Sequence, residues 1–252
     1  MSQVVLVTGG AGKFGRNIVA SMLARGDTVV FTSRSEESIS DLMQLHSSND
    51  GKLIGLQVDF MSASAAKDIL CQLKERNLFP VGLVNNARSL DFLKVSDNGV
   101  VARENFIGEF LIDVVAPYEL TMALAVDPGS RLRRVVNIGS QYGVVAANPA
   151  LYTDYLRQSP LHYGVAKAAL GHLTRELAVR LASKEILVNC IAYGGVEGRV
   201  DDAFKSRYAD LVPLGRMLLD AEIAGPINYL LSEECSGMTG QVISVDGGWS
   251  IW

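Results

Sequence analysis

Hydrophobic positions along the chain follow two alternating patterns. Short runs rich in β-branched residues predict buried strands, and longer segments with apolar residues every three or four positions predict helices. The predicted strands are Val4–Thr8, Thr28–Thr32, Leu53–Val58, Val81–Asn85, Arg134–Ile138, Leu187–Ile191 and Val242–Val245. The predicted helices are Phe14–Arg25, Ser35–Leu45, Ser64–Arg76, a long stretch around Val101–Ala125, Pro160–Ser183 and Ala221–Leu231.

Regular alternation of strand and helix is typical of a parallel sheet with helices on both faces. Several of the strands are apolar throughout, as expected for strands that are covered on both sides. No repeat, low-complexity tract or linker rich in Pro, Gly and Ser divides the 252 residues. We therefore predict an α/β fold, with a single doubly wound Rossmann-type domain over residues 1–252.

Composition excludes several classes of protein. Apolar residues make up 48% and charged residues 20%, which is typical of a folded globular chain. A net charge of −4 without a long basic run argues against nucleic-acid binding. No run of 18 apolar residues suggests a membrane span, and the start lacks the basic region of a signal peptide. Cys71, Cys190 and Cys235 are widely spaced, so we expect no metal site, no disulfide framework and a reducing cytoplasmic location.

A glycine-rich segment, Thr8–Gly15, follows the first predicted strand and opens a helix. Its glycines at 10, 12 and 15 fit the pattern G-x-G-x-x-G in the required context. There the backbone must turn tightly and let a pyrophosphate approach the helix N-terminus. The segment predicts dinucleotide binding, and the alternative is a turn with no ligand.

The end of the second predicted strand distinguishes NADP from NAD. NAD-binding chains usually place an acidic residue there, whereas this chain has Ser33-Arg34. Arg34 offers a fork of donors to a 2′-phosphate, so we expect NADP(H) to be preferred over NAD(H). The alternative is a solvated arginine that opens a helix. Lys13 either adds charge near the same phosphate or points to solvent, and Asp59 either accepts from adenine or caps a helix.

Tyr163 and Lys167 form Tyr-x-x-x-Lys on a predicted helix, with both side chains on one face. Other motifs occur in order with this pair: Thr8–Gly15, Asn85-Asn86-Ala87, Asn137-Ile138-Gly139-Ser140, Val188-Asn189-Cys190 and Val245-Asp246-Gly247-Gly248. Together they resemble the short-chain dehydrogenase/reductase family across essentially the whole chain.

This resemblance implies roles for individual residues. Tyr163 would be the general acid and base, Ser140 would hold the substrate oxygen, and Lys167 would bind the nicotinamide ribose and favour the phenolate form of Tyr163. Residues 193–196 would close over the nicotinamide. The implied cofactor-binding residues are Gly9, Gly12, Lys13, Phe14, Ser33, Arg34, Asp59, Phe60, Asn86, Ala87, Tyr163, Lys167, Gly194 and Val196.

The chain also departs from the family pattern. The family's asparagine that supports the proton relay corresponds to Asp113, with Asn105 as the alternative. Arg88 stands in place of a glycine after Asn86-Ala87, and Tyr193 in place of a proline. Ser140 and Tyr163 are 23 positions apart, roughly ten more than is usual, and surface loops absorb such insertions at little entropic cost.

The longer segment between Ser140 and Tyr163 bears on the substrate. With Asn86-Ala87-Arg88 and the glycine spacing, it is similar to oxidoreductases encoded with flagellin-glycosylation and nonulosonic-acid pathways, which act on sugar derivatives. We therefore predict that Arg88, Tyr142 and Tyr155 contact a small hydroxylated substrate. The alternative is that the segment is variable decoration.

The leading hypothesis is an NADP-dependent oxidoreductase that moves hydride between nicotinamide and a secondary alcohol or ketone of a sugar-like molecule. The first alternative is a 3-oxoacyl-thioester reductase acting on acyl carrier protein, and the second is a module that senses NADP without turnover. The family resemblance also implies a homo-oligomer, a tetramer or dimer. Trp249 and Trp252 are candidates for contact with a neighbouring subunit.

Overall fold

A parallel sheet runs through the computed structural model, which describes residues 3–49, 51–198 and 200–252. In the described residues it has seven strands in the order β3-β2-β1-β4-β5-β6-β7. The strands are β1 (Val4–Val7), β2 (Thr28–Ser33), β3 (Leu53–Gln57), β4 (Gly82–Asn85), β5 (Arg134–Ser140), β6 (Leu187–Tyr193) and β7 (Val242–Val245). Strand order reverses between β1 and β4, and ligands of such sheets bind outside the carboxyl ends of the strands at this point.

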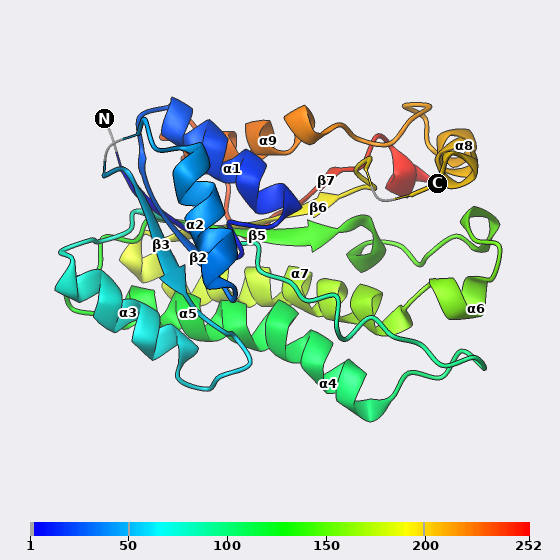
Figure 1. Cartoon of the computed structure of the whole chain (residues 1–252), viewed down its shortest axis with the longest axis horizontal. Coiled ribbons are helices and arrows are strands. Elements are labelled where there is room, and N and C mark those ends of the chain that lie inside the picture. The colour runs from blue at the N-terminus through cyan, green and yellow to red at the C-terminus, as the bar shows by residue number, and fades with distance from the viewer. Residues whose placement is uncertain (1–2, 50, 199) are drawn as a thin grey trace.

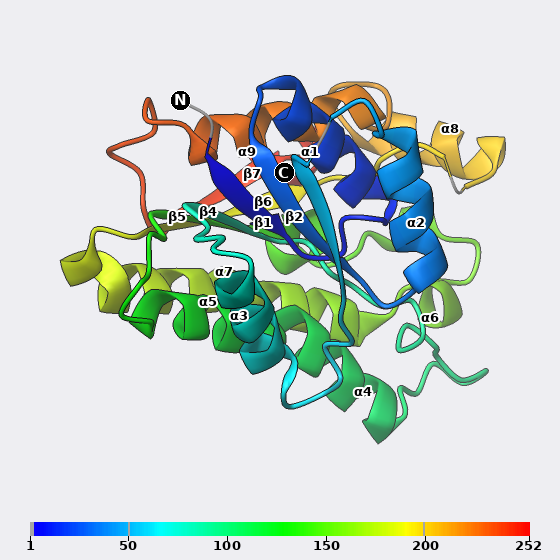
Figure 2. The ribbon, with the colours of Figure 1, turned by 60° about the vertical axis from the view of Figure 1, so that its left-hand side comes forward.

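Helices cover both faces of the sheet (Figures 1 and 2). On one face lie α1 (Lys13–Ala24), α2 (Glu36–Leu45) and α9 (Ala224–Leu231). On the other lie α3 (Ala65–Glu75), α4 (Arg103–Phe110), α5 (Ala116–Val126) and α7 (Leu161–Leu181). The short helices α6 (Tyr155–Gln158) and α8 (Asp202–Leu211) lie beyond the carboxyl ends of β5 and β6. No helix among the described residues has the length and apolarity needed to cross a bilayer.

Side chains of the central strands point alternately into two hydrophobic cores. Val5 and Val7 of β1 join the core beneath α1, whereas Leu6 between them joins the core beneath α5 and α7. All three side chains are at most 1% exposed. A strand buried on both faces needs apolar residues at successive positions, which is the pattern that predicted it.

The predicted α/β fold with a doubly wound parallel sheet is confirmed, and the differences lie at the ends of some strands, inside one predicted helix and in two helices that were not predicted. Both β5 and β6 run two residues further than predicted, to Ser140 and Tyr193. The stretch around Val101–Ala125 is α4 followed by a π-helical turn, Leu111–Val115, and then α5. Two helices were missed, α6 and α8, because α6 is one turn long and α8 buries only Tyr208, so it shows no clear apolar face.

A buried polar network ties the middle of the sheet to α7. Asn137 of β5 is fully buried, and its Nδ2 donates to Thr174 Oγ1 of α7 at 2.9 Å. Its Oδ1 accepts from Asn85 Nδ2 of β4 at 2.8 Å. Each amide therefore has a partner, as buried polar groups require.

Thr174→Val should lower the free energy of unfolding by about 1–3 kcal/mol, because the new side chain keeps the shape but leaves Asn137 Nδ2 without an acceptor. Urea denaturation followed by circular dichroism measures the change. Thr153→Val, at an exposed threonine, is the control and should stay within about 0.5 kcal/mol of the wild type. Equal midpoints for the two variants would contradict the role of the network.

Candidate active site

A cavity of about 740 Å³ opens at the carboxyl ends of the strands, where the strand order reverses. The turn between β1 and α1, the ends of β2, β4, β5 and β6, and helices α7 and α8 all contribute to its wall. Its volume lies within the range of small-molecule and cofactor sites. Of the residues expected to bind cofactor or substrate, all except Asp59 and Tyr155 line it.

The turn between β1 and α1 is built to bring backbone close to a ligand. Gly9 has φ +63°, and a Cβ there would lie 2.8 Å from Ala87 Cα. Asn86 Nδ2 donates to Thr8 O and Gly9 O, and Thr8 Oγ1 accepts from the backbone N–H of Asn86 and of Ala87. These bonds hold the turn against the end of β4.

The N-terminus of α1 fits the pyrophosphate of a dinucleotide. Gly12 caps the helix with no side-chain hydrogen bond, so the first N–H groups have no side-chain acceptor. Free N–H groups and the helix dipole attract anions. A Cβ at Gly15 would lie 2.2 Å from Gly9 O, so the glycine also keeps the turn closed against the helix.

Arg34, which lines the cavity at the end of β2, is already paired with a carboxylate. Arg34 Nη1 lies 3.0 Å from Asp91 Oδ2, and both side chains are more than half exposed. Ser89 Oγ also donates to Asp91, and these bonds, the one from Ser89 first, hold the pKa of Asp91 below its usual value. A 2′-phosphate at Arg34 would therefore share the guanidinium with Asp91.

The other two candidates for the adenosine end lie differently. Lys13 lines the cavity, but its Nζ is 3.3 Å from Asp220 Oδ1, in the segment before α9. Asp59 Oδ1 accepts from the backbone N–H of Met61 at 2.9 Å, in the loop that leads to α3. Its neighbour Phe60 lines the cavity.

Ser140, Tyr163 and Lys167 all line this cavity. Ser140 ends β5, and its Oγ accepts from the backbone N–H of Tyr142 at 3.2 Å. Tyr163 and Lys167 lie one turn apart on α7, with Lys167 Nζ 5.7 Å from the centre of the Tyr163 ring. The structure thus brings together three side chains that are 27 positions apart from first to last.

Lys167 carries a charge in a buried position. Its Nζ donates to Asp113 Oδ1 and to the carbonyl of Ile138, both at 3.0 Å. Burial is the largest single effect and opposes the ammonium form, but the charge of Asp113, the nearby Tyr163 and the hydrogen bond to Asp113 together outweigh it, so the pKa of Lys167 is raised. Asn105, the alternative to Asp113, lies elsewhere and donates to the carbonyl of Lys94.

Tyr193, which replaces the family's proline, anchors the segment that follows β6. Its hydroxyl donates to the carbonyl of Ile223 at 2.5 Å, and its ring meets that of Phe14 edge to face at 5.4 Å. Gly194 lies next along the cavity wall, where a Cβ would be 2.8 Å from Asp246 Cα. Sequence reasoning saw only the missing proline, whereas Tyr193 links this segment to α1 and to the start of α9.

Aromatic and apolar side chains form the outer part of the cavity. Tyr142 and Tyr152 share a hydrogen bond of 2.7 Å between their hydroxyls, and burial raises the pKa of both. Arg88 lies over Tyr163, with Cζ 5.5 Å from the ring centre. Tyr155 lies beyond Tyr152, with ring centres 6.0 Å apart. The remaining outer residues are Leu151, Val200, Phe204, Tyr208 and Met217.

The expectation that Trp249 contacts a neighbouring subunit is wrong. Its side chain is 4% exposed and stacks on Tyr208 at 4.6 Å within the same chain. Tyr208 in turn donates to Gln141 Oε1 and accepts from the backbone N–H of Gly195. Trp249 thus supports the cavity wall from behind, whereas Trp252 is 76% exposed.

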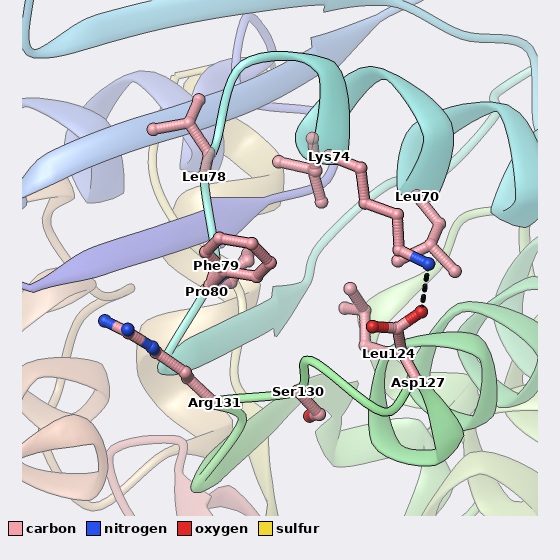
Figure 3. A pocket seen from close by; sticks show the side chains of 10 residues that line it. Leu70, Lys74, Leu78, Phe79, Pro80, Leu124, Asp127, Ser130 and Arg131 are labelled. Carbon is pink, nitrogen blue, oxygen red and sulfur yellow. Dashed lines mark ion pairs between the residues drawn. The ribbon is translucent and has the colours of Figure 1, made fainter.

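A second hollow, of about 20 Å³, lies away from this chemistry at the amino ends of β4 and β5 (Figure 3). An ion pair between Lys74 of α3 and Asp127 closes one side of it. None of the expected site residues lines it. Within the described part of the chain, no group of three His, Cys, Asp or Glu side chains is placed to hold a metal ion.

An open parallel sheet with this glycine turn and this serine, tyrosine and lysine at one edge defines a class of nicotinamide-dependent oxidoreductases. A family model described as enoyl-(acyl carrier protein) reductase matches residues 10–250. The chain belongs to the short-chain dehydrogenase/reductase family, and it is an oxidoreductase acting on CH–OH or C=O groups.

Relatives span this chain almost completely. The 3-oxoacyl-[acyl-carrier-protein] reductase of Aquifex aeolicus is 30% identical, over 98% of this chain and 96% of that protein. The post-translational flagellin modification protein A of Campylobacter coli is 25% identical, over 99% of both. A short-chain dehydrogenase of Leptospira borgpetersenii with bound NAD⁺ superimposes with a TM-score of 0.86 at 27% identity, over 99% of this chain and 93% of that one. Pseudomonas aeruginosa RhlG in complex with NADP superimposes with a TM-score of 0.85 at 26% sequence identity, over 98% of this chain and 96% of that one.

Proposed function

We propose that the protein is an NADP-preferring oxidoreductase that interconverts a ketone and a secondary alcohol on a small, hydroxylated or anionic molecule of sugar-like character. The observation that carries this proposal is the convergence of Ser140, Tyr163 and Lys167, with Arg88 over the tyrosine ring. When bound, the nicotinamide dinucleotide supplies or accepts the hydride.

The residues of the chain then handle the oxygen atom of the substrate. In the reductive direction Ser140 Oγ donates a hydrogen bond to the carbonyl oxygen, and Tyr163 Oη gives its proton to the oxygen as negative charge develops there. Lys167 provides a fixed positive charge near the tyrosine, which favours the phenolate that remains. In the oxidative direction the phenolate of Tyr163 accepts the proton from the alcohol.

Tyr163→Phe should fold, bind cofactor and lose turnover by about 10²–10⁴-fold, because only the hydroxyl that transfers the proton is removed. Steady-state rates with a panel of ketones and alcohols, together with NADPH titration by fluorescence, measure the two effects separately. A variant that keeps more than about a tenth of the wild-type rate would exclude this role for Tyr163. Tight NADPH binding by a wild type that turns over no carbonyl compound would favour the sensing module.

The preference for NADP(H) rests on the residues at the end of β2. Ser33 carries no negative charge that would repel a 2′-phosphate, and Arg34 lines the cavity beside it. The pairing with Asp91 moderates this preference, because the carboxylate competes with a 2′-phosphate for the same guanidinium. Asp91 is therefore a determinant that the strand-end pattern alone does not reveal.

Arg34→Ala should weaken NADPH binding by about 10- to 100-fold and leave NADH binding unchanged, since a charge-assisted hydrogen bond contributes about 1.5–3 kcal/mol. Asp91→Asn should strengthen NADPH binding by up to about tenfold, because the competing charge is gone. Dissociation constants for both nucleotides test this pair of variants. Equal affinities of the wild type for the two nucleotides would contradict the proposed preference.

Polar groups in the outer cavity support a hydroxylated or anionic substrate. Arg88 offers a charged fork, and the paired hydroxyls of Tyr142 and Tyr152 offer further donors and acceptors. The similarity to a flagellin modification protein agrees with this class. A second candidate, a 3-oxoacyl thioester, is supported by the apolar wall of Leu151, Val200, Phe204 and Met217 and by the relative in Aquifex aeolicus.

Arg88→Ala should raise KM for a hydroxylated or anionic ketone by about tenfold, because a charged hydrogen-bond donor is lost, and should leave cofactor affinity unchanged. Arg131→Ala is a matched control, since Arg131 lies over Phe79 at 5.6 Å in a similar arrangement at the other end of the sheet. kcat/KM for sugar-like ketones and for medium-chain 3-oxoacyl thioesters decides between the two substrate classes. Higher values for thioesters, with no effect of Arg88→Ala, would favour the acyl reductase.

Assembly into a homo-oligomer is also part of the proposal. Helices α4, α5 and α7 carry exposed apolar side chains, among them Ile107, Tyr118, Val165 and Val179, each at least 44% exposed. These side chains are candidates for burial in such a subunit contact.

A further inference from the structure

Two acidic side chains lie buried behind Lys167. Glu109, in the last turn of α4, is 1% exposed, and Asp113, in the π-helical turn that follows, is 2% exposed. Residues four positions apart lie on the same side of a helix, so both carboxyl groups are directed to one place. Single π-helical turns inside longer helices frequently mark functional sites.

Some oxygen atoms of these two carboxyl groups accept a hydrogen bond and others do not. Asp113 Oδ1 accepts from Lys167 Nζ. Asp113 Oδ2 and Glu109 Oε2 are buried and have no hydrogen-bond partner among the described residues. Ionised carboxylates can only accept hydrogen bonds, so two of them buried on one side of a helix without donors would be costly. One proton between the two carboxyl groups would let one of them donate to the other.

Charged and titratable groups from neighbouring elements face this pair. Burial and then the charge of Asp113 raise the pKa of Glu109 to about 7, while Lys167 of α7 and Arg88 after β4 lower it. Tyr163 faces Lys167 from the same helix. His162, beside Tyr163, is held by a bond of 2.6 Å between its Nε2 and the carbonyl of Phe92. Because Asp113 is the member paired with the ammonium group of Lys167, Glu109 is the one that carries the proton.

We propose that Glu109 and Asp113 share one proton in the resting enzyme, and that loss of this proton changes the charge beside Lys167 and so controls the ionisation of Tyr163. Glu109 is a positioning residue, because it acts through Asp113 and Lys167. With Glu109 protonated, the negative charge of Asp113 balances the positive charge of Lys167. When Glu109 gives its proton to solvent, a second negative charge appears next to Lys167.

The direction of the effect follows from this charge. A second carboxylate opposes the phenolate form of Tyr163, so the phenol persists to higher pH. Ketone reduction, which needs the phenol, is then maintained to higher pH, and alcohol oxidation, which needs the phenolate, begins at higher pH. This inference rests on the role of Tyr163 given under the proposed function.

Glu109→Gln tests the proposal, because its amide still donates to Asp113 but cannot ionise. We expect the alkaline fall of kcat/KM for ketone reduction to move to lower pH by about one unit, as expected for removing one nearby charge in a partly screened site. Glu104→Gln, at an exposed glutamate in the same helix, is the control and should keep the wild-type profile. A Glu109→Gln profile that superimposes on the wild-type profile would overturn the proposal.

A second variant keeps the test valid should Glu109→Gln fold poorly. In Asp113→Asn only one carboxyl group remains beside Lys167, so no second negative charge can appear there and the alkaline fall should move in the same direction. Difference infrared spectroscopy on the cofactor-free protein should show a protonated carboxyl at about pH 6 in the wild type, because the pKa of Glu109 is raised to about 7, and none in Glu109→Gln. Absence of that band in the wild type would overturn the proposal. Because the infrared measurement needs no turnover, it tests the shared proton independently of the proposed role of Tyr163 in catalysis.

Discussion

The charge of Lys167 is the constraint around which this site is organised. An ammonium group removed from water costs several kcal/mol unless it is paired and hydrogen-bonded. Asp113 and the carbonyl of Ile138 supply two partners, and the face of Lys167 toward the cavity is left for Tyr163 and for a ligand. Helix α7, β5 and the π-helical turn must therefore keep their relative positions for the charge to remain buried.

The network beneath the site meets this requirement. Asn137 lies in β5 one position before Ile138, and Thr174 lies on α7 about two turns beyond Lys167. The bond between them fixes the helix against the strand that presents the Ile138 carbonyl. The geometry of Lys167 thus depends on polar groups that do not line the cavity. An isolated buried amide is costly, so the network holds only when complete.

Much of this arrangement was predictable from the sequence. Apolar strands such as Val4–Val7 and the glycine turn specify the parallel sheet and its switch point, because both patterns are local. The meeting of Ser140, Tyr163 and Lys167 was predictable only through the family motifs. Glu109 and Asp91 were missed for a physical reason. Each acts on a residue far from it in sequence, Glu109 through Asp113 on Lys167 and Asp91 on Arg34, and neither partner follows from spacing along the chain.

The long connection between Ser140 and Tyr163 is held against the rest of the fold by buried side chains, hydrogen bonds and an ion pair. Leu151 within it is fully buried, and its carbonyl accepts from Arg207 Nε of α8 at 2.8 Å. Tyr152 is held by Tyr142, and Arg157 pairs with Asp97 of the segment before α4. The connection is thus joined to two other parts of the fold, α8 and the segment before α4, and it is also bonded within itself. Under the proposed function, a wall that is already held in place would select substrates by its shape and by the hydroxyl groups of its tyrosines, and less by closing over a bound molecule.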